Sequence, residues 1–349
     1  MGIRLIIQGG LTVNRKTLSL FTLIAVLVTL PVALGACSGS AENETKVRIG
    51  EVTRSIFYAP QYVALSQGFF KEEGLDVELT TTAGGDKTMT ALLSNAIDVA
   101  LVGSETSIYV HQQGSDDPVV NFAQVTQTDG TFLVSRKPVA KFDWSMLKGS
   151  TFLGQRKGGM PQMAGEFTLK KKGIDPHKDL NLIQNVDFAN IPAAFSSGTG
   201  EYVQLFEPQA TMIEREGKGH VIASFGVESG KLPYTVFMAK KSYMDRNQAT
   251  IQKFTNAVHR AQKWVNDKPV DEIAAALTPY FADTDKEVVK AVVKRYKDQQ
   301  SFATDPIVDE QEWNNLQDVM QAAGELKQRA DYKALVDTSY ARKAIEAAK

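Results

Sequence analysis

The sequence predicts an α/β protein of two lobes, each built on a doubly wound sheet. Its 349 residues exceed what one ordinary core organises, which favours two lobes. Residues 47–52, 60–67 and 75–79 form a strand, a helix and a second strand by their apolar spacing. A similar alternation recurs over residues 151–208. We therefore expect two similar halves, with loops gathered at the carboxyl ends of the strands.

The first helix has clear ends in the sequence. Pro60 suits the first turn of a helix because it lacks an N–H, and Gly68 suits the left-handed position just beyond a helix end. The preceding loop, 55–59, then lies at the carboxyl end of a strand and the amino end of a helix. Free backbone N–H groups there favour a polar or anionic ligand, so we expect a ligand cleft at this edge.

The amino terminus has the layout of a bacterial export signal. Three basic residues precede an uncharged run at 18–34, which ends in the lipobox-like sequence LGAC, closing on Cys37. We predict a signal peptide at 1–36, lipidation of Cys37, and a polar tether at 37–46. A transmembrane anchor is the alternative, but about 17 apolar residues ending in small residues favour cleavage.

Composition argues against several classes of function. The 39 Lys and Arg nearly balance the 40 Asp and Glu, unlike a nucleic-acid-binding or polybasic membrane surface. The nucleophile elbow and the dinucleotide-binding glycine pattern are both missing, so we expect no enzyme and no cofactor. We also expect no metal site, because the spacing of the four histidines matches no familiar ligand pattern. These are His111, His177, His220 and His259.

Several short motifs occur in a characteristic order along the chain. They are AP-Q-YVA at 59–64, GFF at 68–70, GLDVEL at 74–79, FEP at 206–208 and LVDTSYARKA at 335–344. Together they resemble the solute-binding proteins of ABC importers, in the group for nitrate, sulfonates, taurine and thiamine pyrimidine precursors. The resemblance implies a type II periplasmic-binding-protein fold. It also implies a monomeric receptor, lipid-anchored outside the bacterial cell membrane, that delivers a small molecule to permease and ATPase subunits.

We expect two crossings between the lobes, at Phe132–Arg136 and Tyr234–Ala239. Lobe one then comprises residues 47–135 and 235–349, and lobe two comprises 136–234. Such paired crossings form a hinge that closes on a ligand. Helices after Asn247 complete lobe one, each with suitable length and stop signals. They are expected at 250–267, 271–281, 285–297 and 310–322.

The candidate ligand residues lie in loops and strand ends expected to meet at the cleft. Four aromatic residues could stack on a ligand or belong to the core: Tyr58, Phe188, Phe206 and Tyr234. Three glycines could admit the ligand to the backbone or only permit turns: Gly84, Gly85 and Gly159. Ser104 and Met160 lie at expected helix starts beside the cleft. Glu207 could accept a ligand N–H or only favour a helix start.

The kind of ligand follows from these side chains. Aromatic residues outnumber cationic ones in the loops expected at the cleft, and Arg54 and Arg156 are interpreted as surface charges. We therefore favour a planar nitrogenous heterocycle, such as a thiamine pyrimidine precursor, as the ligand. Three alternatives stay open. They are a sulfonate, taurine or nitrate receptor, a ligand sensor that signals through another membrane protein, and a pyrimidine-synthesising enzyme of the same fold. The enzyme is disfavoured because the mature chain lacks its cysteine-rich iron motif.

Overall fold

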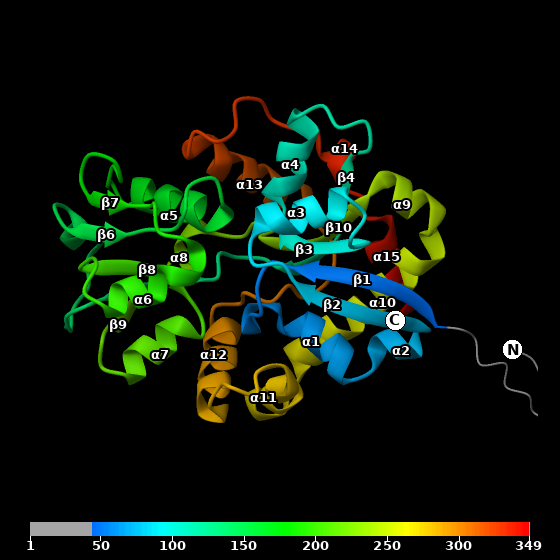
Figure 1. The fold of residues 1–349 in the computed structure, drawn as a ribbon, viewed down its shortest axis with the longest axis horizontal. Helices are drawn as coiled ribbons and strands as arrows, with labels where there is room; N and C mark the ends of the chain where they lie inside the picture. Colours follow the sequence, from blue (N-terminus) through cyan, green and yellow to red (C-terminus); the bar gives the residue numbers. More distant parts are fainter. Residues whose placement is uncertain (1–43, 349) are drawn as a thin grey trace, which may run out of the picture. The chain divides into compact units, whose positions relative to one another are not determined.

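The computed structural model describes residues 44–348, which belong to one compact unit. They form two five-stranded mixed sheets flanked by helices, so the predicted α/β architecture with two sheets is confirmed (Figure 1). The predicted signal peptide 1–36, the lipidation of Cys37 and most of the tether 37–46 lie outside the described residues. Within 44–348, no helix combines the length and apolar character needed to cross a membrane.

The first sheet has the strand order β2-β1-β3-β10-β4. Strands β1, β2 and β3 are parallel, whereas β10 runs antiparallel to β3 and β4. The carboxyl ends of the parallel strands therefore deliver their loops to one edge. The strands are β1 (Thr45–Glu51), β2 (Leu75–Thr81), β3 (Val99–Gly103), β4 (Val119–Thr126) and β10 (Thr235–Lys240).

The second sheet repeats this topology, with the order β7-β6-β8-β5-β9. Here β5 is the strand that runs antiparallel to its neighbours, β8 and β9. In each sheet the antiparallel strand thus occupies the fourth position and has come across from the other lobe. The strands are β5 (Thr131–Ser135), β6 (Thr151–Leu153), β7 (Asn181–Ile183), β8 (Tyr202–Phe206) and β9 (His220–Ser224).

The chain passes between the sheets at residues 127–130 and 230–234. The second passage agrees with the predicted return strand, which is β10. The first was expected at Phe132–Arg136 and is corrected, because β5 pairs along its whole length with β8 of the second sheet. An apolar run shows that a strand is buried, but not which sheet it joins. The first segment of lobe one therefore ends with β4, a strand that our sequence analysis did not predict.

Helices pack around both sheets (Figure 1). The predicted helix at 60–67 is α1, and Gly68 beyond it has a φ of 75°, as its left-handed position requires. The expected loop at Gly226–Pro233 instead begins within a short helix, α8 (Phe225–Ser229). The lobe-one helices are η1 (Ile56–Tyr58), α1 (Ala59–Ser66), α2 (Phe69–Glu72), α3 (Gly85–Leu93), α4 (Glu105–Gln112), α9 (Lys241–Arg246), α10 (Gln248–Asp267), α11 (Val270–Leu277), η4 (Thr278–Tyr280), α12 (Lys286–Asp298), α13 (Glu310–Ala322), α14 (Tyr332–Leu335) and α15 (Ser339–Ala347). The lobe-two helices are η2 (Trp144–Leu147), α5 (Met160–Lys171), η3 (Phe188–Asn190), α6 (Ile191–Ser196), α7 (Gln209–Arg215) and α8.

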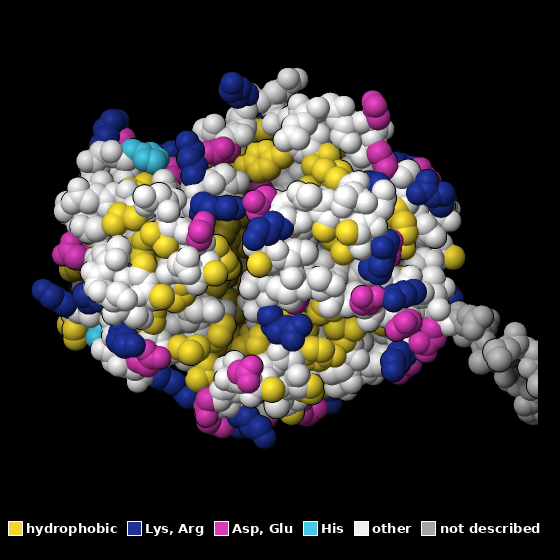
Figure 2. Space-filling view, in the orientation of Figure 1, with side chains coloured by type: hydrophobic (Ala, Val, Ile, Leu, Met, Phe, Trp, Pro, Cys, Tyr) yellow, Lys and Arg dark blue, Asp and Glu magenta, His cyan; other side chains and the backbone are white. Residues whose placement is uncertain are grey.

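The larger apolar core is continuous across the two lobes. It includes Ile49 of β1 and Val203 of β8, joined through Tyr58, Met160 and Tyr234, all of which are buried. Apolar burial is the dominant favourable term in packing of this kind. The lobes are therefore in contact at the edge where the sequence predicted the cleft. Figure 2 shows hydrophobic side chains gathered in the hollow between the two halves of this face.

Candidate ligand cleft between the lobes

The predicted aromatic residues meet around a residue that we did not single out, Phe57. Its ring centroid lies 6.1 Å from that of Tyr58, 6.0 Å from Phe206 and 5.6 Å from Tyr234. Phe188, which is 37% exposed, packs edge-on against Phe206 at 5.8 Å. These five residues, here called the aromatic cluster, join lobe one, lobe two and the return passage.

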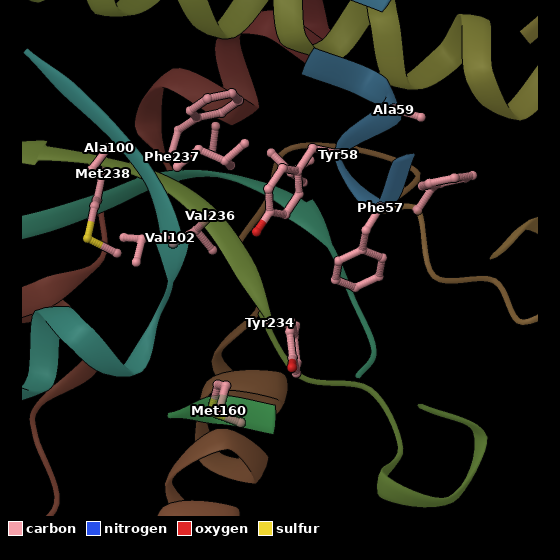
Figure 3. Packing of buried hydrophobic residues seen from close by; sticks show 14 of the residues in the cluster. Phe57, Tyr58, Ala59, Ala100, Val102, Met160, Tyr234, Val236, Phe237 and Met238 are labelled. Atoms are coloured by element: carbon pink, nitrogen blue, oxygen red, sulfur yellow. The ribbon is translucent and has the colours of Figure 1, made fainter. Parts of the chain in front are cut away.

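Phe57 is held in place by its own loop and by the first passage. The Ser55 hydroxyl accepts a hydrogen bond from the Phe57 N–H at 3.3 Å, which caps η1. A Cβ added to Gly130 would lie 2.8 Å from the Phe57 ring, so only glycine leaves room there. Figure 3 shows Phe57 and Tyr58 extending from η1 towards Tyr234, with Met160 beyond it.

Polar contacts also connect the lobes at this edge. Glu105 Oε1, in the first turn of α4, accepts the Met160 N–H at 3.3 Å. The Tyr109 hydroxyl, one turn further along α4, donates to the Gly158 carbonyl at 3.3 Å. The loop before α5 thus rests against α4. A ligand entering between these elements must first separate them.

The three candidate glycines differ in what they require. Gly84 has a φ of 148°, and a Cβ there would lie 2.7 Å from Asp86 Oδ1, so the turn into α3 needs glycine. At Gly85 and Gly159 the nearest contacts of an added Cβ would be ordinary ones, 3.5 Å and 3.6 Å away. All three lie directly before or at the start of α3 or α5.

Two predicted polar residues are already hydrogen-bonded within the protein. The Ser104 hydroxyl donates to the carbonyl of Pro233 and ties the end of β3 to the return passage. Glu207 is 1% exposed, and its Oε1 lies 2.5 Å from Arg295 Nη1. Thr211 donates to both Glu207 oxygens at 2.9 Å, from its N–H and its hydroxyl. A ligand N–H would compete with these bonds at Glu207.

Three other buried polar atoms are less well partnered. Among the described residues, Glu105 Oε2 makes no hydrogen bond, and Asp129 Oδ2 and the Tyr234 hydroxyl have no partner other than each other. Burial raises the pKa of Glu105 to about 7 and that of Asp129 to about 6. The pKa of Tyr234 is also raised, by burial first, then by the charge of Asp129 and a hydrogen bond to it, and less by Glu105, so these groups are neighbours.

Our sequence analysis did not single out Glu105 or Asp129 as site residues. A signal for Glu105 existed, because it is an acid in the first helical turn after the fully apolar strand 99–102. Asp129 lies in a passage whose position the sequence did not reveal. The role of a polar residue at such a position depends on the groups that lie across the cleft from it. The pattern of neighbouring residues in the sequence does not reveal those groups.

The two candidate cations are half exposed, and each lies near a carboxylate, of which that of Glu51 is buried. Arg54 Nε lies 3.7 Å from Glu51 Oε1, and Arg156 Nη2 lies 3.3 Å from Asp86 Oδ1, with both arginine side chains about half exposed. No group of His, Cys, Asp and Glu side chains suited to a metal ion occurs within residues 44–348. The cleft is thus aromatic and acidic in character.

Two lobes joined by two passages, with buried polar atoms facing their junction, define the class of periplasmic-binding-protein folds. The sequence profile of the NMT1-like family matches residues 40–279, and the chain belongs to this family. It is 60% identical over 316 residues to YtlA of Bacillus subtilis strain 168, a candidate binding protein by its name. That alignment covers 90% of this chain and 94% of YtlA.

Solved structures agree on the fold. One is the ligand-binding component of an ABC-type import system from Staphylococcus aureus, with a TM-score of 0.69 and 17% identity over 86% of this chain and 99% of that one. Another is the periplasmic nitrate-binding protein NrtA of Synechocystis, with a TM-score of 0.69 and 19% identity over 87% of this chain and 89% of that one. At these identities the likeness concerns the fold alone.

Proposed function

We propose that this chain is the extracytoplasmic solute-binding lipoprotein of an ABC importer, and that it captures a planar nitrogenous heterocycle such as a thiamine pyrimidine precursor. The observation that carries the proposal is the aromatic cluster. Lobe one contributes Phe57 and Tyr58, and lobe two contributes Phe188 and Phe206. Aromatic faces from both sides can bury and orient a flat ring, and closure of the lobes then retains it.

The partners follow from this role. The protein acts as a monomer that presents its ligand to a permease with ATPase subunits, and ATP hydrolysis belongs to those partners. The motif resemblance, the relationship to YtlA and the fold shared with an import component of Staphylococcus aureus support this assignment. Binding without catalysis agrees with the names of these proteins.

A sulfonate, taurine or nitrate receptor is the second candidate, favoured by the fold shared with NrtA. An oxyanion needs strong donors, and arginine is the usual one. Here Arg54 and Arg156 are each paired with a carboxylate. The buried Glu105 beside Met160 would also repel an anion at close range when its carboxyl is ionised. The heterocycle is therefore the better fit.

A ligand panel should separate the two candidates. We expect thiamine-precursor pyrimidines and related heterocycles to raise the melting temperature, because a ligand that binds the folded state stabilises it. Phe206→Ala should weaken their binding by about tenfold, through loss of a stacking surface. Calorimetry measures this. Phe142→Ala is the control, since Phe142 packs on Trp144 with ring centroids 5.2 Å apart, outside the aromatic cluster. The assignment would be overturned if taurine, alkanesulfonates or nitrate bind tightly and the heterocycles do not bind.

Membrane attachment gives a separate prediction. Cys37→Ala should move the protein from the membrane fraction to the soluble fraction, because several acyl chains on one cysteine supply the attachment. Fractionation of the expressing bacterium, followed by immunoblotting, measures the distribution. Ser38→Ala, which keeps the cysteine, is the matched control and should stay with membranes. If the Cys37 variant still sediments after salt and carbonate washes, the anchor lies elsewhere.

A further inference from the structure

Three buried polar atoms lie where the lobes meet: Glu105 Oε2, which has no hydrogen-bond partner, and Asp129 Oδ2 and the Tyr234 hydroxyl, whose groups interact with each other. Their residues are only 5%, 0% and 4% exposed, respectively. A buried polar atom without a hydrogen bond is unfavourable, and native proteins keep few of them. Glu105 Oε2 lies between the lobes, at the amino ends of α4 and α5, where a donor on a bound ligand would complete its hydrogen bonding.

The Glu105 carboxylate is positioned by two features of the chain. Its Oε1 accepts the Met160 N–H at 3.3 Å, which leaves Oε2 as the free oxygen. The side chain folds back over Gly103, where an added Cβ would lie 2.1 Å from Oε2. The carboxylate therefore occupies the space that glycine leaves open. Glu105 Oε1 thus accepts a hydrogen bond from the opposite lobe, and Oε2 stays available to another donor.

The ionisable side chains found beside Glu105 among residues 44–348 are tyrosines, which do not compensate its charge. Tyr58 of η1, Tyr109 of α4 and Tyr234 before β10 are the groups whose pKa values respond to it. Asp129 adds a second carboxylate next to Tyr234. Among residues 44–348, the contacts that lower the pKa of Glu105 are backbone N–H groups, not cations. A hydrogen-bond donor on the ligand would be the missing partner.

We propose that Glu105 Oε2 accepts a hydrogen bond from an amino group of the ligand, with Tyr234 and Asp129 as a second polar contact, so that the cleft selects amino-substituted heterocycles. The inference rests on the proposed function and names the substrate class of the same site. A carboxylate is required because two acceptors are needed, one for the Met160 N–H and one for the ligand. Glutamine offers a single acceptor oxygen and would turn its NH2 group towards one of the two donors.

The test compares two probes of equal shape, 4-amino-2-methylpyrimidine and 2,4-dimethylpyrimidine, by calorimetry on the purified full-length protein. The methyl group keeps the size of the amino group but has no N–H. We expect the wild type to bind the amino probe about 10- to 100-fold more tightly, the range for a hydrogen bond to a charged group. In Glu105→Gln this preference should shrink to a few-fold. Gly103→Ala, which displaces the same carboxylate, should have a similar effect.

The matched control is Glu312→Gln. Glu312 is a half-buried carboxylate on α13 that accepts from Gln124 at 3.0 Å, and it takes no part in the cleft. Its substitution should leave the preference for the amino probe unchanged. If Phe206→Ala weakens binding about tenfold while Glu105→Gln keeps the full preference, the proposal for Glu105 is wrong and the heterocycle assignment stands. If the wild type binds neither probe, both are overturned.

Discussion

Replacing Arg295 with methionine should lower the free energy of unfolding by about 3–5 kcal/mol, because it leaves a buried carboxylate without its cation. Glu207 is the carboxylate, with a fully buried side chain 2.5 Å from Arg295 Nη1. The arginine also lies 3.0 Å from Glu214 Oε2, so α12 is joined to α7 and to the end of β8 through one side chain. Methionine keeps much of the stem that packs there but offers no donor.

Lys294→Met provides the comparison from the same helix. Lys294 Nζ lies 2.5 Å from Asp298, but both side chains are more than 60% exposed. A pair in that setting contributes little, so we expect a change within about 0.5 kcal/mol. Urea unfolding followed by circular dichroism gives both values. If Arg295→Met costs no more than Lys294→Met, the Glu207–Arg295 pair does not join α12 to α7 and β8 as we describe.

The second large effect is a pH dependence that originates at Glu105. Burial raises the pKa of this carboxyl from its ordinary value of 4.5 to about 7 in the folded protein. The carboxyl of Glu105 therefore stays protonated to a higher pH in the folded state than in the unfolded state. Stability from this group is fully present below pH 4.5 and is lost as the pH rises through 7. The full shift corresponds to about 3 kcal/mol, an upper limit because opening of the lobes would hydrate the carboxylate.

The measurement is the free energy of unfolding at pH 5 and pH 8 for the ligand-free wild type and Glu105→Gln. Relative to the variant, the wild type should lose about 2–3 kcal/mol between these pH values, since glutamine does not titrate. The comparison removes the similar contribution of Asp129, which both proteins retain. Glu346→Gln, on an exposed position of α15, should keep the wild-type profile. Parallel profiles for wild type and Glu105→Gln would mean that the carboxylate is not buried in solution.

Much of the local structure follows from the sequence because its signals are local. Pro60 and Gly68 delimit α1, and the last predicted helix coincides with α13 (Glu310–Ala322). Asn95, interpreted as tolerating the left-handed conformation at a helix end, has a φ of 62°. The strand at 202–206 was predicted at the bounds of β8. Each of these depends on interactions within a few residues.

The sequence alone determined the α/β class with its two sheets, the family-level resemblance and a set of aromatic residues that the fold brings together. The tertiary structure decided which sheet β5 joins, and hence where the lobes divide. It also decided the pairing of Glu207 with Arg295, 88 residues apart, and the contact of Glu105 with Met160, 55 residues apart. The physical reason is that periodicity reports whether a residue is buried, whereas its partner is set by which surfaces the whole chain brings into contact.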